Sequence, residues 1–338
     1  LSQPISDAKV LTGRQRPLTQ VAMLFAEITS SDGHQGIGFS YSKRAGGPGM
    51  YAHAREVAAD LIGEDPNDIA RLWTKLVWAG ASVGRSGLST QAIAAFDNAL
   101  WDMKAKRAGL PLAKLLGCRR EGVPCYNTSG GFLSSSIEEV LDSVEASIAS
   151  GIGGIKIKVG HPDPKVDLSR LDAVAKAIDG RVALMVDANQ AFHYHEALLR
   201  SHMLADVGIT WFEEPMPADD LTGHARLSAA SRVPVAVGES LYSPGQFADY
   251  LRAGACSIVQ VDVARVGGIT PWLKVAHMAE AHNLSICPHF LMEIHVSLVC
   301  AVPNAPWLEY IPQLDEIAAP MAREGGFALA PKVPGLGI

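Results

Sequence analysis

The stretch Gly154-Ile-Lys-Ile-Lys-Val-Gly160 combines a short apolar run with two closely spaced lysines, and it decides the fold. In an extended strand successive side chains point to opposite faces, so Lys156 and Lys158 emerge on the same face. The residues around them are β-branched, which favours a strand buried in a sheet. Two ammonium groups on one face of a buried strand are costly and indicate a chemical role. The alternative is an edge strand with solvated lysines.

The composition is that of a globular protein with a sizeable core. Of the 338 residues, 48% are hydrophobic and 19% are charged, and the formal net charge of −6 favours neither nucleic acid nor an acidic membrane surface as partner. The five scattered cysteines form no CxxC pair and fit reduced thiols better than a disulfide framework. With no membrane-length apolar run and no signal peptide, we expect a cytoplasmic protein.

The first part of the chain, residues 1–120, is predicted to be an α+β domain. Strands are expected at 21–29 and 36–41, joined by a turn at 31–33, and helices at about 51–62, 67–78 and 89–108. We predict that Ser89 caps the last helix and that Gly109 ends it.

Residues 121–320 repeat a pattern of short apolar strands and helical segments. Units of roughly 20–30 residues predict an α/β fold with a (β/α)8-type barrel. An open doubly wound sheet would normally carry a Gly-rich phosphate turn after its first strand, and none is present. The strand candidates lie at 125–128, 154–159, 183–187, 209–213, 233–239, 257–262, 284–289 and 307–310.

Nearly every one of these strands ends near an ionisable residue. The carboxyl ends of barrel strands meet at one mouth, where active sites are built. Converging carboxylates cannot all stay ionised without a cation, and oxygen ligands without thiolate or imidazole favour Mg²⁺. A single such carboxylate would more often be a helix cap or a surface residue. The candidate metal ligands are Asp187, Glu213 and Glu239.

A base is available on either side of the predicted metal site. Asp262 and His289 end neighbouring strands, so the carboxylate could orient the imidazole and raise its basicity. Lys158 would face them across the mouth. Two bases flanking a divalent metal suit proton removal next to a carboxylate, with Mg²⁺ and Lys156 stabilising the enediolate. Taken alone, His289 would more often be structural or solvated.

Several of these motifs together resemble the mandelate racemase subgroup of the enolase superfamily, over essentially the whole chain. They are the Lys-x-Lys pair, Asp187-Ala-Asn-Gln190, Glu213-Glu-Pro215, Gly238-Glu239 and Pro288-His-Phe290. The resemblance implies one Mg²⁺ per subunit on the three carboxylates, and Lys156 at the substrate carboxylate. It implies Lys158 and His289 as the acid/base pair, Asp262 as the partner of His289, and a protonated Glu309 as hydrogen-bond donor to the enediolate.

Other segments are similar to dehydratases of hexaric (aldaric) acids within that subgroup. They are 39–46, 82–87, 101–106 and 126–131. This similarity implies a dianionic sugar acid as substrate, β-elimination of water to a 3-deoxy-2-keto acid, and C2 epimerisation as a competing outcome. We also expect a homo-oligomer.

The resemblance further implies that the N-terminal domain caps the barrel mouth. The capping candidates Asp7, Lys9, Lys43 and Arg44 lie in loop-like stretches and would bind hydroxyls and the distal carboxylate; alone they would be read as solvated charges. Asn189 follows a metal ligand and is expected to reach the substrate. Residues 321–338 are expected to return toward the capping domain and to be incomplete.

Three other functions remain open at this level. A dehydratase or racemase for another sugar acid or α-hydroxy acid would keep the barrel residues and change those of the cap. A metal-dependent aldolase or hydrolase would not need Lys158 and His289 on opposite faces, although His193 and His195 have the spacing of some zinc hydrolase ligands. A non-catalytic sugar-acid binding protein would bind without turnover.

Overall fold

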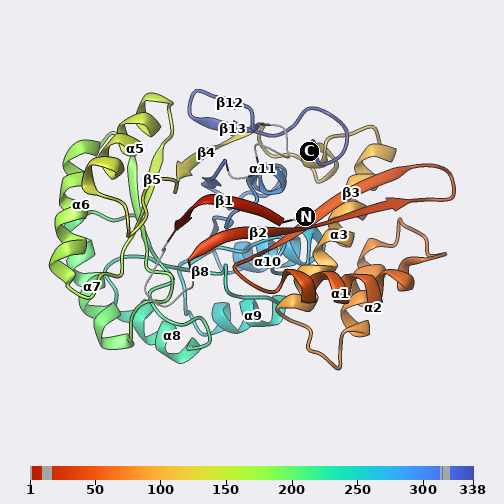
Figure 1. Ribbon diagram of the computed structural model, residues 1–338, viewed down its shortest axis with the longest axis horizontal. Coiled ribbons are helices and arrows are strands. Elements are labelled where there is room, and N and C mark those ends of the chain that lie inside the picture. Colours follow the sequence, from red (N-terminus) through yellow and green to blue (C-terminus); the bar gives the residue numbers. More distant parts are fainter. Residues whose placement is uncertain (1, 10–16, 313, 315–319) are drawn as a thin grey trace.

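The N-terminal part of the protein is a small antiparallel sheet packed on helices. The computed structural model describes residues 2–9, 17–312, 314 and 320–338. In the sheet, the order of the strands is β1-β2-β3. Figure 1 shows this capping domain, in red to orange, beside the barrel. Its elements are β1 (Ser2–Lys9), β2 (Leu18–Thr29), β3 (Gln35–Lys43), α1 (Gly47–Val57), η1 (Ala58–Leu61), α2 (Ile69–Ala79), α3 (Leu88–Arg107) and α4 (Leu112–Leu115).

Strand β3 lies directly on the backbone of α3 because two of its residues lack a side chain. A Cβ on Gly36 would stand 2.1 Å from the carbonyl oxygen of Ala99, and one on Gly38 would stand 2.3 Å from that of Ala95. Only glycine permits so close an approach. The contact fixes where β3 ends, and that end points to the barrel mouth.

The ends of α3 agree with the sequence prediction at one terminus only. Gly109 has a φ of 66° and its N–H donates to the carbonyl of Lys106, while Leu110 N–H donates to Ala105, so glycine ends the helix as predicted. The prediction that Ser89 caps the helix is wrong. Its hydroxyl lies inside the helix and donates to the carbonyls of Gly84 and Ser86, because the helix begins after Gly87.

The second part of the chain is a parallel barrel whose strands run in the predicted order. The sheet order is β10-β9-β8-β7-β6-β5-β4, and β11 pairs with β4 in parallel. All eight predicted strands are present, most of them shorter than expected. They are β4 (Gly122–Asn127), β5 (Gly154–Lys158), β6 (Ala183–Asp187), β7 (Phe212–Glu213), β8 (Val235–Val237), β9 (Ile258–Val259), β10 (Ser285–Ile286) and β11 (Leu308–Tyr310).

Helices cover the outside of the barrel between successive strands (Figure 1). Their starts are encoded locally: Ser136 and Glu139 form a reciprocal capping box on the first of them, and Ser243 caps another whose first residue is Pro244. The helices are α5 (Ile137–Ala149), α6 (Pro164–Ile178), α7 (Tyr194–Val207), α8 (Leu221–Ala230), α9 (Pro244–Arg252), α10 (Ile269–Ala281) and α11 (Met292–Ala301).

Among the residues described after β11, the next elements are the two strands of a hairpin. In the residues described after β11, β12 (Arg323–Glu324) and β13 (Phe327–Leu329) pair with each other and with β4 in antiparallel fashion. The chain then reaches the capping domain, where Leu336 N–H donates to Asp102 of α3 at 2.8 Å. The predicted domain ranges 1–120, 121–320 and 321–338 stay predictions.

A buried aromatic layer closes the barrel below the mouth. Tyr126 and Trp211 meet edge to face at 5.2 Å within a cluster that also holds Met185 and Cys287, and Trp307 packs against it. Trp211 is therefore a packing residue. All five cysteines are free thiols. None of the described helices combines the length and apolarity needed to cross a membrane.

Candidate active site

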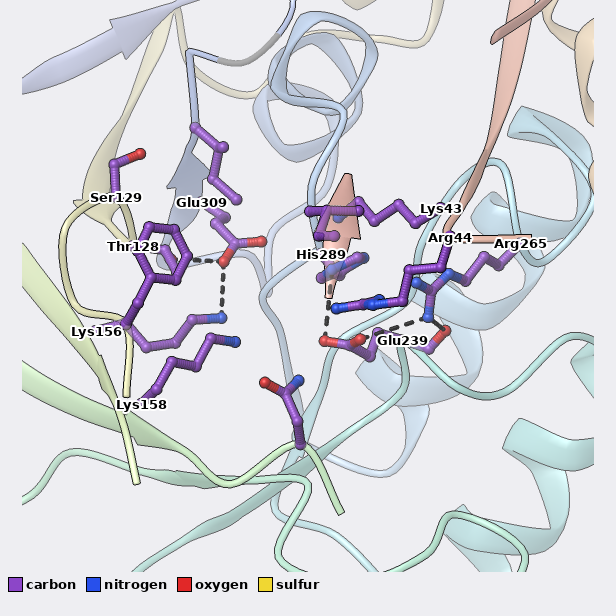
Figure 2. A pocket seen from close by; sticks show the side chains of 14 residues that line it. Lys43, Arg44, Thr128, Ser129, Lys156, Lys158, Glu239, Arg265, His289 and Glu309 are labelled. Atoms are coloured by element: carbon purple, nitrogen blue, oxygen red, sulfur yellow. Dashed lines mark hydrogen bonds and ion pairs between the residues drawn. The ribbon is translucent and has the colours of Figure 1, made fainter. Parts of the chain in front are cut away.

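A pocket opens at the carboxyl ends of the barrel strands. The capping domain supplies part of its wall through Leu18, Lys43 and Arg44. Figure 2 shows Lys156 and Lys158 on one side of this pocket and His289, Glu239 and Arg265 on the other. The remaining lining residues are Thr128, Ser129, Phe132, Asn189, Glu309 and Ile311.

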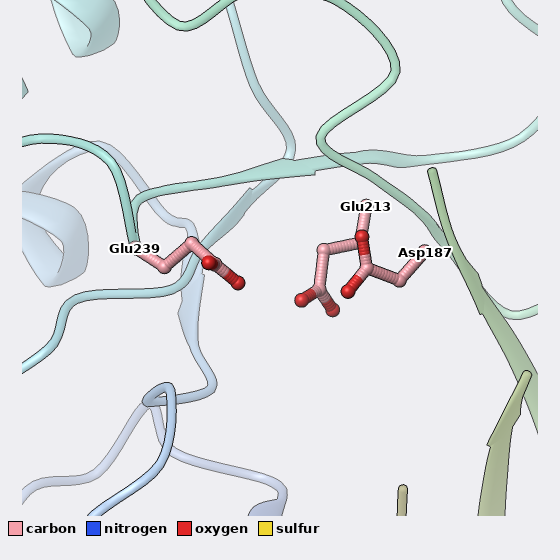
Figure 3. A group of neighbouring side chains, drawn as sticks. All are labelled: Asp187, Glu213 and Glu239. Atoms are coloured by element: carbon pink, nitrogen blue, oxygen red, sulfur yellow. The ribbon is translucent and has the colours of Figure 1, made fainter. Parts of the chain in front are cut away.

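Three carboxylates converge beside the pocket, as predicted. Asp187 ends β6, Glu213 ends β7 and Glu239 follows β8 by two residues. One oxygen atom from each lies within 4.8 Å of the others, and all three side chains are buried (Figure 3). This is the one such group of potential metal ligands in the described ranges. An all-oxygen, buried, anionic set fits Mg²⁺.

The lysine side of the pocket is formed by two ion pairs from β5. Lys156 is 1% exposed, and its Nζ lies 2.8 Å from Glu213 and 2.7 Å from Glu309. Lys158 pairs with Asp187. Both lysines therefore point at carboxylates of other barrel strands. The edge-strand alternative with solvated lysines is wrong because β5 lies between β4 and β6.

The two carboxylates beside Lys156 differ in their affinity for protons. Burial and the nearby charge of Asp187 raise the pKa of Glu213 to about 8. Burial also opposes ionisation of Glu309, but the ammonium of Lys156 and the charge of His289 outweigh it and lower its pKa to about 2. Lys156, expected at the substrate carboxylate, thus also contacts Glu309. The protonated Glu309 that the resemblance implies stays a prediction.

The histidine side is formed by the loops after β9 and β10. His289 Nδ1 lies 2.7 Å from Asp262 Oδ2, and Nε2 lies 3.4 Å from Glu239. Although Asp262 is buried, the hydrogen bond and charge of His289 and the charge of Arg265 hold its pKa well below the ordinary range. With Asp262 ionised, Nδ1 carries a proton and Nε2 faces the pocket.

Several polar side chains that hold the predicted site residues were missed from the sequence. Arg265 donates to the carbonyl of Glu239 at 2.7 Å and lies 3.4 Å from its carboxylate. Gln260 donates to Glu213 at 2.5 Å, and Thr128 donates to Glu309 at 2.7 Å. In the sequence, only their positions close to strand ends could have marked these residues as part of the site.

The predicted substrate-binding residues of the capping domain lie in two different strands or beside them. Lys43 ends β3 and Arg44 follows it, with Lys43 Nζ 3.8 Å from the centre of the Phe290 ring. Burial, followed by the charge of Arg265, lowers the pKa of Lys43 to about 7. The backbone of Asp7 and Lys9 lies in β1 and not in a loop, and their side chains are outside the described residues.

Asn189 lies at the pocket floor with an unusual backbone conformation. Its φ is 42°, its N–H donates to Asp187 at 2.7 Å, and its Oδ1 is buried with no hydrogen-bond partner in the described part of the chain. A buried amide oxygen aimed at a pocket is suited to a ligand donor. His193 and His195, in contrast, are both exposed at the start of α7 and belong to no metal-ligand group in the described ranges.

Comparison with known protein families shows to which family this chain belongs. Residues 139–338 match the family described as Enolase C-terminal domain-like, and residues 14–117 match the Mandelate racemase / muconate lactonizing enzyme, N-terminal domain. The chain belongs to the enolase superfamily. The predicted family, the capping domain and the parallel barrel are thereby confirmed.

Sugar-acid dehydratases are among the enolase superfamily members that resemble this chain. The L-talarate/galactarate dehydratase of Salmonella typhimurium is 54% identical over 94% of this chain and 80% of its own length. A crystal structure of that protein, liganded with Mg and L-lyxarohydroxamate, covers 99% of this chain and 87% of its own, with 49% identity and a TM-score of 0.96. The L-talarate dehydratase of Polaromonas sp. JS666, complexed with Mg and L-glucarate, covers 95% and 90%, with 53% identity and a TM-score of 0.92.

Proposed function

We propose that this protein catalyses the Mg²⁺-dependent dehydration of hexaric acids, with galactarate and L-talarate as substrates. The observation that carries the proposal is the placement of Lys158 and His289 on opposite sides of one pocket, beside three metal-ligating carboxylates. The 54% identity to a dehydratase of these two acids supports the choice of substrate.

The lysine side is suited to hold the reacting carboxylate of the substrate. Lys156 is buried and contacts two carboxylates, so its ammonium offers a group that binds anions more strongly than an exposed lysine would. Bound to Asp187, Glu213 and Glu239, Mg²⁺ would add positive charge where the enediolate develops. Asn189 Oδ1 accepts a hydrogen bond from a substrate hydroxyl.

The chemistry needs one proton to leave C2 and one to reach the departing hydroxyl. Lys158 or His289, according to the configuration at C2, accepts the C2 proton, and the electron pair remains as the enediolate. The C3–O bond then breaks with a proton supplied from the same pair, and water leaves. The resulting enol ketonises to a 3-deoxy-2-keto acid. Asp262 keeps His289 in the required tautomer.

The capping domain would recognise the second carboxylate of the substrate. Figure 2 shows Lys43 and Arg44, which line the pocket at the end of β3, on the side of Glu239 and Arg265 and across from Lys156 and Lys158. Asp7 and Lys9 are also proposed as substrate-binding residues. We also propose that the enzyme acts as a cytoplasmic homo-oligomer, which light scattering on the purified protein would test.

The test is a panel of mono- and diacid sugars incubated with purified enzyme, followed by detection of 2-keto acids. We expect product from galactarate and L-talarate with Mg²⁺, none after chelation, and recovery when Mg²⁺ is restored. Turnover confined to aldonic monoacids would assign a different sugar-acid dehydratase. Binding of hexaric acids with no keto acid formed would contradict the proposal and favour a binding protein.

A further inference from the structure

One residue of the capping domain contacts the catalytic dyad directly. Tyr41 lies in β3 and is 0% exposed, and its hydroxyl donates to Asp262 Oδ2 at 2.5 Å across 221 residues of sequence. The same oxygen faces His289 Nδ1 at 2.7 Å. A side chain of the capping domain thus hydrogen-bonds the carboxylate that orients the histidine.

Four donors together fix the orientation of the Asp262 carboxylate. Oδ1 accepts from the backbone N–H groups of Ala264 and Arg265, at 2.8 and 3.0 Å, while Oδ2 accepts from Tyr41 and His289. Burial raises the pKa of Tyr41 well above its ordinary value, so the hydroxyl stays a donor. Among the described residues, removing the Tyr41 hydroxyl would leave Oδ2 with one hydrogen-bond partner, the imidazole, and with the guanidinium of Arg265, whose Nε lies 3.9 Å away.

The position of Tyr41 is set by the capping domain and by the barrel together. Its backbone pairs with Met23 of β2, and its carbonyl accepts from the side chain of Gln91 in α3 at 3.0 Å. Its ring packs edge to face on Phe290 at 4.8 Å. The hydroxyl can reach Asp262 only when β3 is seated on the barrel mouth.

Lys158 has no comparable contact with the capping domain in the described residues, because its ion pair is with Asp187 of the barrel. We propose that Tyr41 is a positioning residue that aligns the Asp262–His289 dyad when the capping domain is seated, and that proton transfer by Lys158 does not depend on it. The inference rests on the proposed function, in which the two bases act on opposite faces of C2.

The test compares Tyr41→Phe in two backgrounds of the full-length, Mg²⁺-loaded enzyme. Lys158→Ala leaves His289 as base, and His289→Asn leaves Lys158. The measurement is hydrogen–deuterium exchange at C2 of galactarate and L-talarate in deuterated water. We expect Tyr41→Phe to slow exchange about 10-fold or more in the first background, the loss typical of outer-shell hydrogen-bond partners, and less than about twofold in the second. Equal slowing in both backgrounds, or in neither, overturns the proposal.

Two further measurements separate this proposal from general damage and from failure of the proposed function. Tyr250→Phe removes a buried hydroxyl that donates to Ala218 at 2.6 Å, away from the pocket, and should leave exchange unchanged in both backgrounds. If no hexaric acid reacts with the wild type, the proposed function fails. The crystal structure of Tyr41→Phe then tests the positioning role by itself. A second orientation of the Asp262 carboxylate or His289 ring supports the positioning role, and an unchanged dyad overturns it.

Discussion

The two sides of the pocket are built in different ways. The lysine side comes from a single five-residue strand, whose alternation places Lys156 and Lys158 on one face against carboxylates of barrel strands. The histidine side is assembled from two loops of the barrel and from β3 of the capping domain. One side is therefore fixed by folding of the barrel alone, whereas the other also requires the capping domain to be in place.

Removing either base should have the largest effect and would show that both sides are needed. Lys158→Ala and His289→Asn are each expected to lower kcat for dehydration by about 100- to 10,000-fold, the range for general acid–base groups. Steady-state kinetics of 2-keto acid formation provides the measurement. Lys165→Ala, an exposed lysine at the start of α6, is the matched control and should retain wild-type kcat. Full turnover in either base variant would contradict the mechanism.

Binding of Mg²⁺ should respond in opposite directions to two changes on the lysine side. Asp187→Asn removes a negatively charged ligand and should weaken Mg²⁺ binding by roughly 10- to 100-fold or more. Lys158→Ala removes the ammonium that pairs with Asp187 and should tighten binding a few-fold, because a cation no longer competes for that carboxylate. Calorimetric titration without substrate measures both. Native affinity in Asp187→Asn would remove this residue from the ligand set.

The sequence predicted the lysine side more completely than the histidine side, for a physical reason. Strand alternation and strand ends are local patterns, so the metal ligands and both lysines could be located before the fold was known. The contact between Tyr41 and Asp262 joins residues 221 positions apart and depends on how two domains dock. The ion pair between Lys156 and Glu309, at 2.7 Å, is likewise a contact that no spacing in the chain reveals.

In the fold, too, local patterns were predicted better than features that depend on long-range contacts. Gly109 ended α3 as predicted because its left-handed conformation is a local property, with a φ of 66°. The cap assigned to Ser89 failed because the helix begins after Gly87 and buries the serine within its first turn. The hairpin β12–β13 was not predicted, because its pairing with β4 is a long-range contact.

The smallest expected effect is on the pH dependence of kcat/KM, through Lys43 of the capping domain. Because the pKa of Lys43 is lowered to about 7, its ammonium is present below that pH and lost above it. The kcat/KM for a hexaric acid should therefore fall as pH rises above 7, by at most about tenfold per unit. Lys43→Arg keeps its charge and should flatten this fall relative to the wild type between about pH 6 and pH 9. An identical pH profile in the variant would exclude Lys43 as the titrating group.

The central claim is that three carboxylates hold one metal ion between an amine and an imidazole. A crystal structure grown with Mg²⁺ and an unreactive hexarate analogue tests it most directly. The account predicts a single ion at about 2.0–2.1 Å from oxygens of Asp187, Glu213 and Glu239, with Lys158 and His289 on opposite faces of C2. An ion bound elsewhere, or both bases on one face of C2, would contradict it.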